Sequence, residues 1–336
     1  MRILVTGGAG YIGSVSVEAL VAAGHEVTVL DDLSTGYRGA VSPAARLEVG
    51  TYGDTAAVAA LLKGDRIDVV LHCAAKSIVG ESMSDPAKYY RENVAGGVAL
   101  LEAMRTTGVR RIVFSSTAAT YGMPERTPIV ETDPIRPINA YGETKRCVEG
   151  AIRWYGHGYG LRSVILRYFN AAGASPVYGE GHDPETHLIP CVLQAAAAGR
   201  EVTLFGDDYP TPDGTCIRDY IHVEDVARAH MLALEATDPA DARTGPASGS
   251  CEPLICNLGS GTGFSNRQVV TATEAVLGRP IAVKMGPRRP GDPPILVASP
   301  QNAHEKLGWT AGKGTLEQII GSAWEWQRAH PAGYPK

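Results

Sequence analysis

A glycine-rich turn between an apolar run and a helical pattern constrains the fold of this 336-residue chain more than any other feature. Residues 3–6 form the short apolar run, and Gly7, Gly10 and Gly13 follow it at spacings of three. Glycines at such a strand-to-helix turn allow a tight bend and let a pyrophosphate approach the helix N-terminus, where backbone N–H groups point outward. The pattern therefore predicts a dinucleotide-binding βαβ unit.

The first half of the chain repeats this alternation of short apolar runs and helical patterns. The predicted strands are residues 3–6, 26–30, 67–72, 111–116 and 163–168, and the predicted helices are residues 11–23, 55–63, 86–107 and 140–157. After residue 170 the alternation gives way to loops rich in Gly, Pro and Asp. The elements predicted there are a helix near 188–198, strands near 202–205 and 220–223, a surface loop over 240–252 and a helix over 316–329. The sequence thus predicts an α/β fold with a Rossmann-type doubly wound parallel sheet and a smaller C-terminal α/β part.

A second motif supplies chemistry. Tyr141 and Lys145 are four residues apart in a predicted helix, so they share one face of it. A lysine ammonium one turn from a phenol favours the phenolate, which lowers a pKa that is normally near ~10. We interpret the pair as a general base that takes a proton from an alcohol while a nicotinamide takes the hydride.

Thr117 follows the predicted strand 111–116 and should lie at the carboxyl edge of the sheet, where ligands bind in open α/β folds. Two interpretations are open: Thr117 caps the following turn, or it hydrogen-bonds a substrate hydroxyl and relays its proton to Tyr141. Beside Tyr141 and Lys145 we favour the relay.

Asp31 and Asp32 close the second predicted strand. Asp31 is placed to hold the adenosine ribose hydroxyls and to repel a 2′-phosphate, so NAD is predicted rather than NADP.

Composition excludes several classes of protein. A formal net charge of -5 argues against a nucleic-acid partner. No apolar stretch approaches the ~18 residues of a membrane span, and the first strand begins too early for a signal peptide. The six cysteines form no CxxC and the nine histidines show no ligand spacing, so a reduced, cytoplasmic protein without a metal is predicted.

Motifs along nearly the whole chain resemble the UDP-glucose 4-epimerase family of extended short-chain dehydrogenases/reductases. They are GGAGYIG (7–13), VGES (79–82), FSST…YG (114–122), YGETK (141–145), LRYFNAAGA (166–174), IRDYIHV (217–223), NLGSGTG (257–263) and RRPGD (288–292). YxxxK and the glycines indicate the superfamily, whereas IRDYIHV, YFN and RRPGD narrow the resemblance to enzymes of nucleotide sugars.

The resemblance implies NAD-dependent inversion of the C4 hydroxyl of a UDP-hexose, UDP-glucose or UDP-galactose, through a transient 4-keto intermediate. Tyr141 matches the family's base, Lys145 its helper, and Thr117 a Ser/Thr position. The implied NAD contacts are Gly7, Gly10, Tyr11, Ile12, Gly13, Asp31, Asp32, Leu33, Ser34, Thr35, Gly36, Thr51, Tyr52, Cys73, Ala74, Ala75, Lys76, Ser77, Asn93, Tyr141, Lys145 and Phe169. The implied substrate contacts are Thr117, Asn170, His187, Leu188, Phe205, Arg218, Arg289, Asp292 and Leu296.

The resemblance also implies a division of the chain. Residues 1–170 would form the NAD-binding domain and receive segments near 219–238 and 253–262, and residues 171–336 would mainly bind the sugar nucleotide. A homodimer through helices 86–107 and 140–157 is expected.

Three positions depart from the family pattern. Thr51 stands where an acidic adenine contact is usual, which predicts weaker NAD retention. Many relatives carry a lysine just before the VGES motif, and this lysine is displaced here, where Lys76-Ser77 stand. Thr186-His187-Leu188 stand where the family has Asn-Asn-Leu near the uracil.

Other functions remain open. A 4,6-dehydratase needs an acid/base pair directly after the threonine, where this chain has Ala118 and Ala119. A dehydrogenase that releases NADH, an NAD-dependent regulator, and epimerases of UDP-N-acetylhexosamines, UDP-pentoses or UDP-uronates are further alternatives. The resemblance also implies that a residue shortly after the RRxGD motif borders the C2 substituent of the hexose. An ungapped count from Asp292 gives Leu296, and a shift of one residue would give Ile295 or Val297.

Overall fold

The computed structural model describes residues 1–241, 243–244, 251–289 and 292–335. At its centre is a seven-stranded sheet whose neighbours all run parallel, in the order β10-β6-β5-β4-β1-β2-β3. The strands are β1 (Arg2–Thr6), β2 (Glu26–Asp31), β3 (Arg46–Val49), β4 (Val69–His72), β5 (Arg111–Thr117), β6 (Arg162–Tyr168) and β10 (Leu254–Leu258). The order reverses between β1 and β4, so the predicted doubly wound fold is confirmed.

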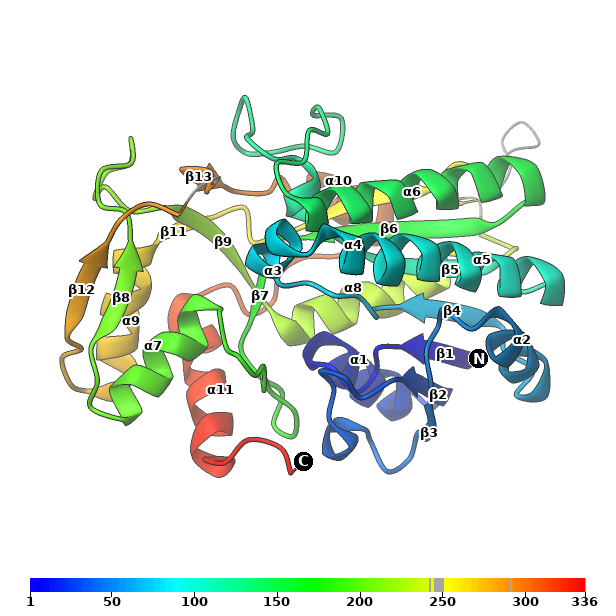
Figure 1. Ribbon diagram of the computed structural model, residues 1–336, viewed down its shortest axis with the longest axis horizontal. Helices are drawn as coiled ribbons and strands as arrows, with labels where there is room; N and C mark the ends of the chain where they lie inside the picture. Colours follow the sequence, from blue (N-terminus) through cyan, green and yellow to red (C-terminus); the bar gives the residue numbers. More distant parts are fainter. Residues whose placement is uncertain (242, 245–250, 290–291, 336) are drawn as a thin grey trace.

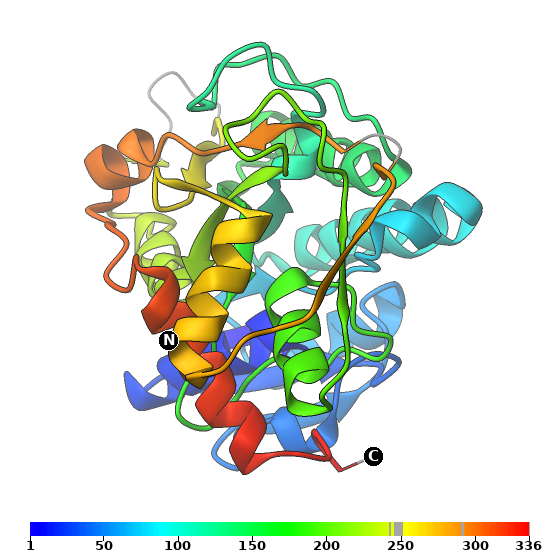
Figure 2. The same ribbon diagram turned by 90° about the vertical axis from the view of Figure 1, so that its left-hand side faces the viewer.

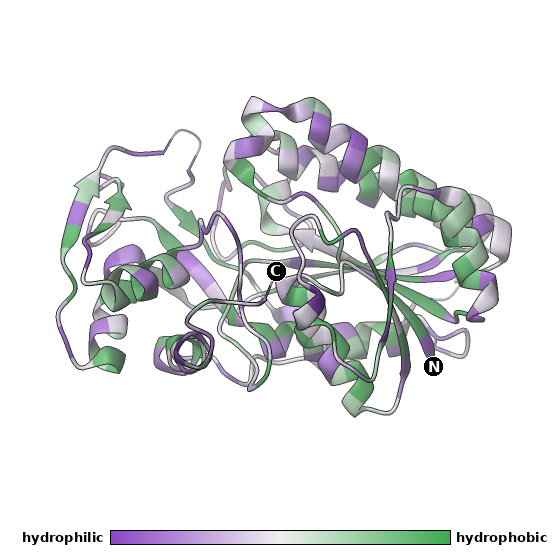
Figure 3. Ribbon diagram, turned by 60° about the horizontal axis from the view of Figure 1, so that its bottom comes forward, coloured by the Kyte–Doolittle hydropathy of each residue, from purple (hydrophilic) through white to green (hydrophobic). Residues whose placement is uncertain are grey.

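Helices cover both faces of this sheet (Figure 1). On one face lie α1 (Tyr11–Ala22), α8 (Val223–Ala236) and α10 (Gln301–Leu307), and on the other α2 (Thr55–Gly64), α5 (Gly96–Thr107) and α6 (Ala140–Tyr159). In β1, Ile3 and Val5 join the first of these cores and Leu4 joins the second. Because both faces are covered, the inner strands are largely apolar, as the green along the sheet in Figure 3 shows, whereas the edge strand β3 includes Arg46 and Glu48.

The smaller part holds the remaining strands and three helices that pack on one another (Figure 2). Its strands are β7 (Asn170–Ala172), β9 (Ile217–His222), β11 (Gly263–Ser265) and β13 (Ile295–Leu296) in one sheet, and β8 (Val202–Phe205) with β12 (Val283–Gly286) in another. Its helices are α7 (Leu188–Ala197), α9 (Asn266–Leu277) and α11 (Leu316–Ala329). The predicted helix over 316–329 is thus confirmed residue for residue.

Several elements differ from the sequence prediction. The predicted helix 86–107 consists of α4 (Pro86–Tyr89), a π-helical turn (Tyr90–Ala95) and α5. The short elements β3 and α3 (Val79–Ser84) lack a periodicity long enough to reveal them. Residues 242 and 245–250 of the predicted loop 240–252 lie outside the described residues.

The second half of the chain returns to the central sheet. β10 pairs with β6 at the edge of that sheet, and α8 packs on its face. These returns support the proposed division, in which residues 1–170 receive the segments near 219–238 and 253–262. Among the described residues, none of the helices combines the length and apolar character of a membrane span.

Candidate active site

A cavity of about 650 Å³ lies along the carboxyl edge of the parallel sheet and reaches the smaller part. Its wall includes the ends of β1, β2, β4, β5 and β6 and segments near residues 170, 187, 218 and 292. The predicted residues on this wall are Gly7, Gly10, Tyr11, Ile12, Gly13, Asp31, Asp32, Ser34, Thr35, Gly36, Thr51, Tyr52, Cys73, Ala74, Ala75, Lys76, Ser77, Thr117, Tyr141, Lys145, Phe169, Asn170, His187, Arg218, Asp292 and Leu296. One cavity thus collects most of the positions that the sequence singled out.

The glycine turn packs so closely against neighbouring backbone that side chains would not fit at Gly7 or Gly13. Gly7 has φ +73, and a Cβ there would lie 2.6 Å from the Ala74 nitrogen. A Cβ on Gly13 would lie 2.0 Å from the Gly7 carbonyl oxygen. Gly10 is the N-cap of α1 and brings no side-chain hydrogen bond, so the helix N-terminus faces the cavity with free donors. The cradle fits the diphosphate of a dinucleotide.

Asp31 is buried at the end of β2 beside this turn. Its Oδ2 accepts a hydrogen bond from the Ala9 N–H at 2.9 Å, and its Oδ1 accepts one from the Leu33 N–H at 2.9 Å. Burial raises the pKa of this carboxyl, and these backbone hydrogen bonds oppose the rise. Each carboxylate oxygen keeps a further lone pair, so Asp31 can still accept ribose hydroxyls.

Asn93 holds the backbone of Lys76, in the segment that follows β4, by two hydrogen bonds. Asn93 lies in the π-helical turn and does not line the cavity; its Oδ1 accepts from the Lys76 N–H at 2.8 Å and its Nδ2 donates to the Lys76 carbonyl at 3.0 Å. Lys76 in turn donates from Nζ to the Ser34 hydroxyl at 2.5 Å and lies 3.9 Å from Asp32. Asn93 therefore positions the residues that line the cofactor end, a role typical of π-turns at functional sites.

Thr51, which stands where the family has an acidic adenine contact, lies on the cavity wall next to Tyr52. Thr51 is exposed, and its hydroxyl accepts a hydrogen bond from the Gly53 N–H at 3.1 Å. Tyr52 donates its hydroxyl to the Glu92 carbonyl at 2.7 Å. Both residues line the cavity, and neither places a carboxylate there.

Tyr141 lies in the first turn of α6, which Asn139 caps by accepting a hydrogen bond from the Gly142 N–H at 2.8 Å. The Thr117 side chain interacts with the Tyr141 phenol and lowers its pKa. Thr117 also accepts from the Ala119 N–H at 3.1 Å, so it caps the following turn as well as contacting the phenol. The two interpretations of Thr117 are compatible.

Lys145 does not act on Tyr141 as the sequence analysis expected. Burial raises the pKa of the Tyr141 phenol to about 12, and the interaction with Thr117 offsets this only in part. The Lys145 ammonium donates to the Ser115 carbonyl at 2.7 Å, and burial lowers its own pKa to about 8. The expected lowering of the Tyr141 pKa by Lys145 is therefore wrong, because burial raises the pKa of this phenol and the Lys145 ammonium donates to the Ser115 carbonyl instead.

The far end of the cavity brings together residues implied to bind a sugar nucleotide. Arg218 donates from Nη1 to the Pro293 carbonyl at 2.8 Å, and its Nη2 lies 3.5 Å from Asp292. Leu296 lies on the cavity wall, in register with Arg218, whereas Ile295 and Val297 do not line the cavity. This placement agrees with the ungapped count from Asp292.

Five predicted residues lie off the cavity wall: Leu33, Asn93, Leu188, Phe205 and Arg289. Leu188 packs into the core of the smaller part, and the Arg289 guanidinium lies 4.2 Å from the centre of the Phe205 ring. Pro290 and Gly291 of the RRPGD motif lie outside the described residues.

Glu180 and His182 are among the polar wall residues that the sequence analysis missed. Glu180 accepts at Oε1 from His182 Nδ1 at 2.8 Å and lies 2.6 Å from His187 Nδ1. These pairings hold the pKa of Glu180 low, at about 2, despite its burial; against the same opposing burial, Glu180 and Glu185 raise the pKa of His187 to about 10. The repeated Glu and His of residues 180–187 were the available signal.

The doubly wound sheet, the glycine cradle and the Tyr141–Lys145 pair define an NAD-dependent enzyme of the short-chain dehydrogenase/reductase class. Residues 3–244 match the model of the NAD dependent epimerase/dehydratase family. Within that family the chain belongs to the UDP-glucose 4-epimerases. The UDP-glucose 4-epimerase of Streptomyces lividans is 52% identical over 335 residues, which cover 99% of this chain and 98% of the relative.

Solved structures of UDP-glucose 4-epimerases have the same fold as this chain. The UDP-glucose 4-epimerase of Brucella ovis, in complex with NAD, has a TM-score of 0.90 at 46% identity, with 96% of this chain and 97% of that chain covered. The enzyme of Bifidobacterium longum, in complex with NAD⁺ and UDP, has a TM-score of 0.90 at 33% identity, with 99% and 100% covered.

Proposed function

We propose that this chain inverts the C4 hydroxyl of a UDP-hexose, with UDP-glucose and UDP-galactose as the pair, through a transient 4-keto sugar. The observation that carries this function is the placement of Tyr141 and Thr117 in the same cavity as the glycine cradle. The full-length likeness to UDP-glucose 4-epimerases supports it.

The residues of the cavity have distinct tasks in this reaction. The glycine turn and Asp31 would hold NAD⁺, which would supply the acceptor for the hydride from the sugar's C4 and positive charge that favours the Tyr141 phenolate. Tyr141 takes the 4-OH proton, directly or through Thr117, and returns it after the keto sugar has turned over. Arg218 is placed for charge-assisted contact with the diphosphate, about which the sugar turns.

The alternatives differ in the residues they need. A dehydratase needs an acid and a base after Thr117, and Ala118 and Ala119 offer neither. A dehydrogenase would release NADH, whereas the net reaction of an epimerase is redox-neutral and leaves the cofactor as NAD⁺. Incubation with a panel of UDP-sugars, with product stereochemistry read by NMR and NADH followed by absorbance, tests the proposal; NADH accumulation without a C4 epimer would overturn it.

Cofactor choice follows from Asp31. We expect NAD⁺ to bind roughly 100-fold more tightly than NADP⁺, because a 2′-phosphate would meet a buried carboxylate of like charge. Titration of both cofactors onto stripped enzyme measures this ratio. Asp31→Asn keeps the shape and removes the charge, so the preference should shrink in that variant. Equal affinities in the wild type would refute the role of Asp31.

Substrate size is expected to depend on Leu296. Leucine leaves partial room beside an apolar wall, so UDP-glucose and UDP-galactose should be the main pair, with weaker turnover of UDP-N-acetylhexosamines. Leu296→Tyr should raise the preference for the non-acetylated pair by roughly 10-fold, the scale of a steric change in an apolar pocket. Comparison of kcat/KM for both pairs tests it, with Leu296→Met as the control; no change in Leu296→Tyr would mean that Leu296 is not the gate.

The remaining implied contacts stay part of the proposal. Asn170, His187 and Asp292 line the cavity beside Arg218, which supports their assignment to the sugar nucleotide. Leu188, Phe205 and Arg289 lie off the cavity wall, and their assignment to the sugar nucleotide is based on the resemblance alone.

We also propose a homodimer through α5 and α6, which lie side by side (Figure 1). Trp154 of α6 is 72% exposed, and Val98 of α5 is 40% exposed, so this face offers apolar side chains to a second copy. Light scattering of the purified chain measures the mass.

The six unpaired cysteines suit the reducing cytoplasm, where we place the protein.

A further inference from the structure

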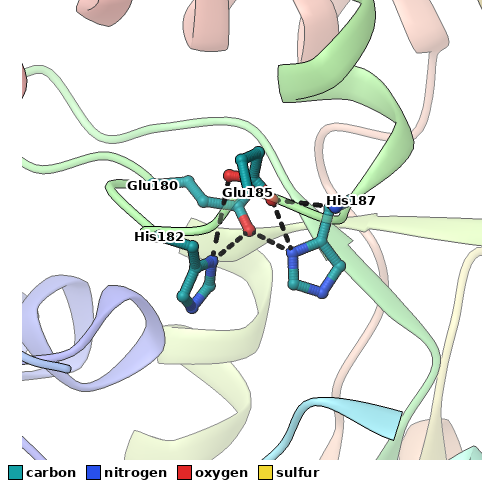
Figure 4. Close-up of side chains that lie close together, drawn as sticks. All are labelled: Glu180, His182, Glu185 and His187. Carbon is teal, nitrogen blue, oxygen red and sulfur yellow. Dashed lines mark hydrogen bonds and ion pairs between the residues drawn. The ribbon is translucent and has the colours of Figure 1, made fainter. Parts of the chain in front are cut away.

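Four side chains that can ligate a metal lie close together (Figure 4), and three of them, Glu180, His182 and His187, line the cavity. They are Glu180, His182, Glu185 and His187, all from the loop between β7 and α7. One donor atom from each residue can be chosen so that all four lie within 4.8 Å of one another.

The distances between the donor atoms suit a single cation. Glu180 Oε1 lies 2.8 Å from His182 Nδ1 and 2.6 Å from His187 Nδ1. Glu185 lies 3.3 Å from His187 Nδ1 through Oε1 and 4.0 Å from His182 Nδ1 through Oε2. Ligands at the Zn–N and Zn–O lengths of a tetrahedral site are about 3.4 Å apart. The two Glu180 contacts are hydrogen-bond lengths, so a bound cation would replace these hydrogen bonds after a small outward shift of the side chains.

The burial and negative charge of the Glu180 and Glu185 carboxylates suit a bound cation. The Glu180 and Glu185 side chains are each 6% exposed, whereas His182 and His187 are 31% and 51% exposed. Two buried carboxylates therefore face two imidazoles at the cavity wall. Buried carboxylates require compensating charge, which either protons on the imidazoles or a metal can supply.

One carboxylate is already oriented by its surroundings. Glu185 Oε1 accepts hydrogen bonds from the Thr186 N–H at 2.7 Å and from the His187 N–H at 2.8 Å. Such outer hydrogen bonds fix the direction of a ligating carboxylate and strengthen a metal site.

We propose that Glu180, His182, Glu185 and His187 bind one divalent transition-metal cation, with Zn²⁺ the best match. Two imidazole nitrogens exclude Mg²⁺ and Ca²⁺, which prefer all-oxygen sites, and two nitrogens with two oxygens suit tetrahedral Zn²⁺. The cation would tie together the two ends of residues 180–187 and so fix the segment that leads into α7. His187 would ligate through Nδ1, which leaves Nε2 available to another partner.

The first test is metal content and affinity, which do not depend on the sugar substrate. Tag-free protein is stripped with chelator, titrated with Zn²⁺ against a chromophoric competitor, and analysed by elemental mass spectrometry. We expect one Zn²⁺ per chain, and a Co²⁺ form with the intense visible absorption of a four-coordinate site. His182→Ala and His187→Ala should each weaken Zn²⁺ binding by roughly 100-fold or more.

His304→Ala, which removes an exposed histidine of α10, is the matched control and should bind as the wild type does. Glu180→Gln keeps the side-chain shape and should also lose affinity, and circular dichroism identifies any variant that fails to fold. Absence of stoichiometric Zn²⁺ binding by the wild type, or equal affinity in the wild type and folded His182→Ala, would overturn the proposal.

Discussion

Tyr141→Phe is expected to lower the turnover of UDP-glucose by about 10²–10⁴-fold, the usual contribution of a general base. The change removes only the phenolic oxygen, which is the atom that exchanges the proton with the sugar's 4-OH. The ring remains in the first turn of α6, so the fold and NAD binding should be retained. An assay of UDP-galactose formation from UDP-glucose measures turnover, and cofactor titration measures NAD binding.

The matched control for this variant is Tyr159→Phe, at the other end of the same helix, where the side chain is 51% exposed. It should turn over as the wild type does. Near-wild-type activity in Tyr141→Phe would end the assignment of Tyr141 as the base.

Arg167→Met is expected to destabilise the protein by about 3–5 kcal/mol, the cost of leaving a buried charge without its partner. The Arg167 side chain is 1% exposed, and its Nε and Nη2 donate to the two carboxylate oxygens of Glu149 at 3.0 and 2.6 Å. Glu149 also accepts a hydrogen bond from the Ser116 hydroxyl at 2.5 Å. Denaturant unfolding of both proteins measures the difference.

Arg153→Ala provides the comparison on the surface. Its ion pair with Glu252 joins side chains that are 59% and 53% exposed, so its loss should cost less than about 1 kcal/mol. Adding Glu149→Gln to Arg167→Met should recover part of the lost stability, because the unpaired charge is then removed. A loss for Arg167→Met as small as that for Arg153→Ala would contradict the importance of the buried pair.

The cofactor end was predictable because its signals are local. The turn of residues 7–13 and the Tyr141–Lys145 spacing each lie within about one or two helical turns, so backbone geometry alone brings their residues together. Asn93 was found only through resemblance; its hydrogen bonds to Lys76 depend on a π-helical turn that no periodicity announces.

The long-range arrangement was less accessible. The chain itself specified the doubly wound sheet, the glycine cradle, Asp31 and the positions of Tyr141 and Thr117, because each depends on short-range periodicity or spacing. Packing alone made the Arg167–Glu149 pair, turned Lys145 toward Ser115, raised the pKa of Tyr141 and buried the carboxylates of Glu180 and Glu185. Burial, distance and charge environment arise from segments remote in sequence, and the energies that depend on them exist only once those segments are packed together.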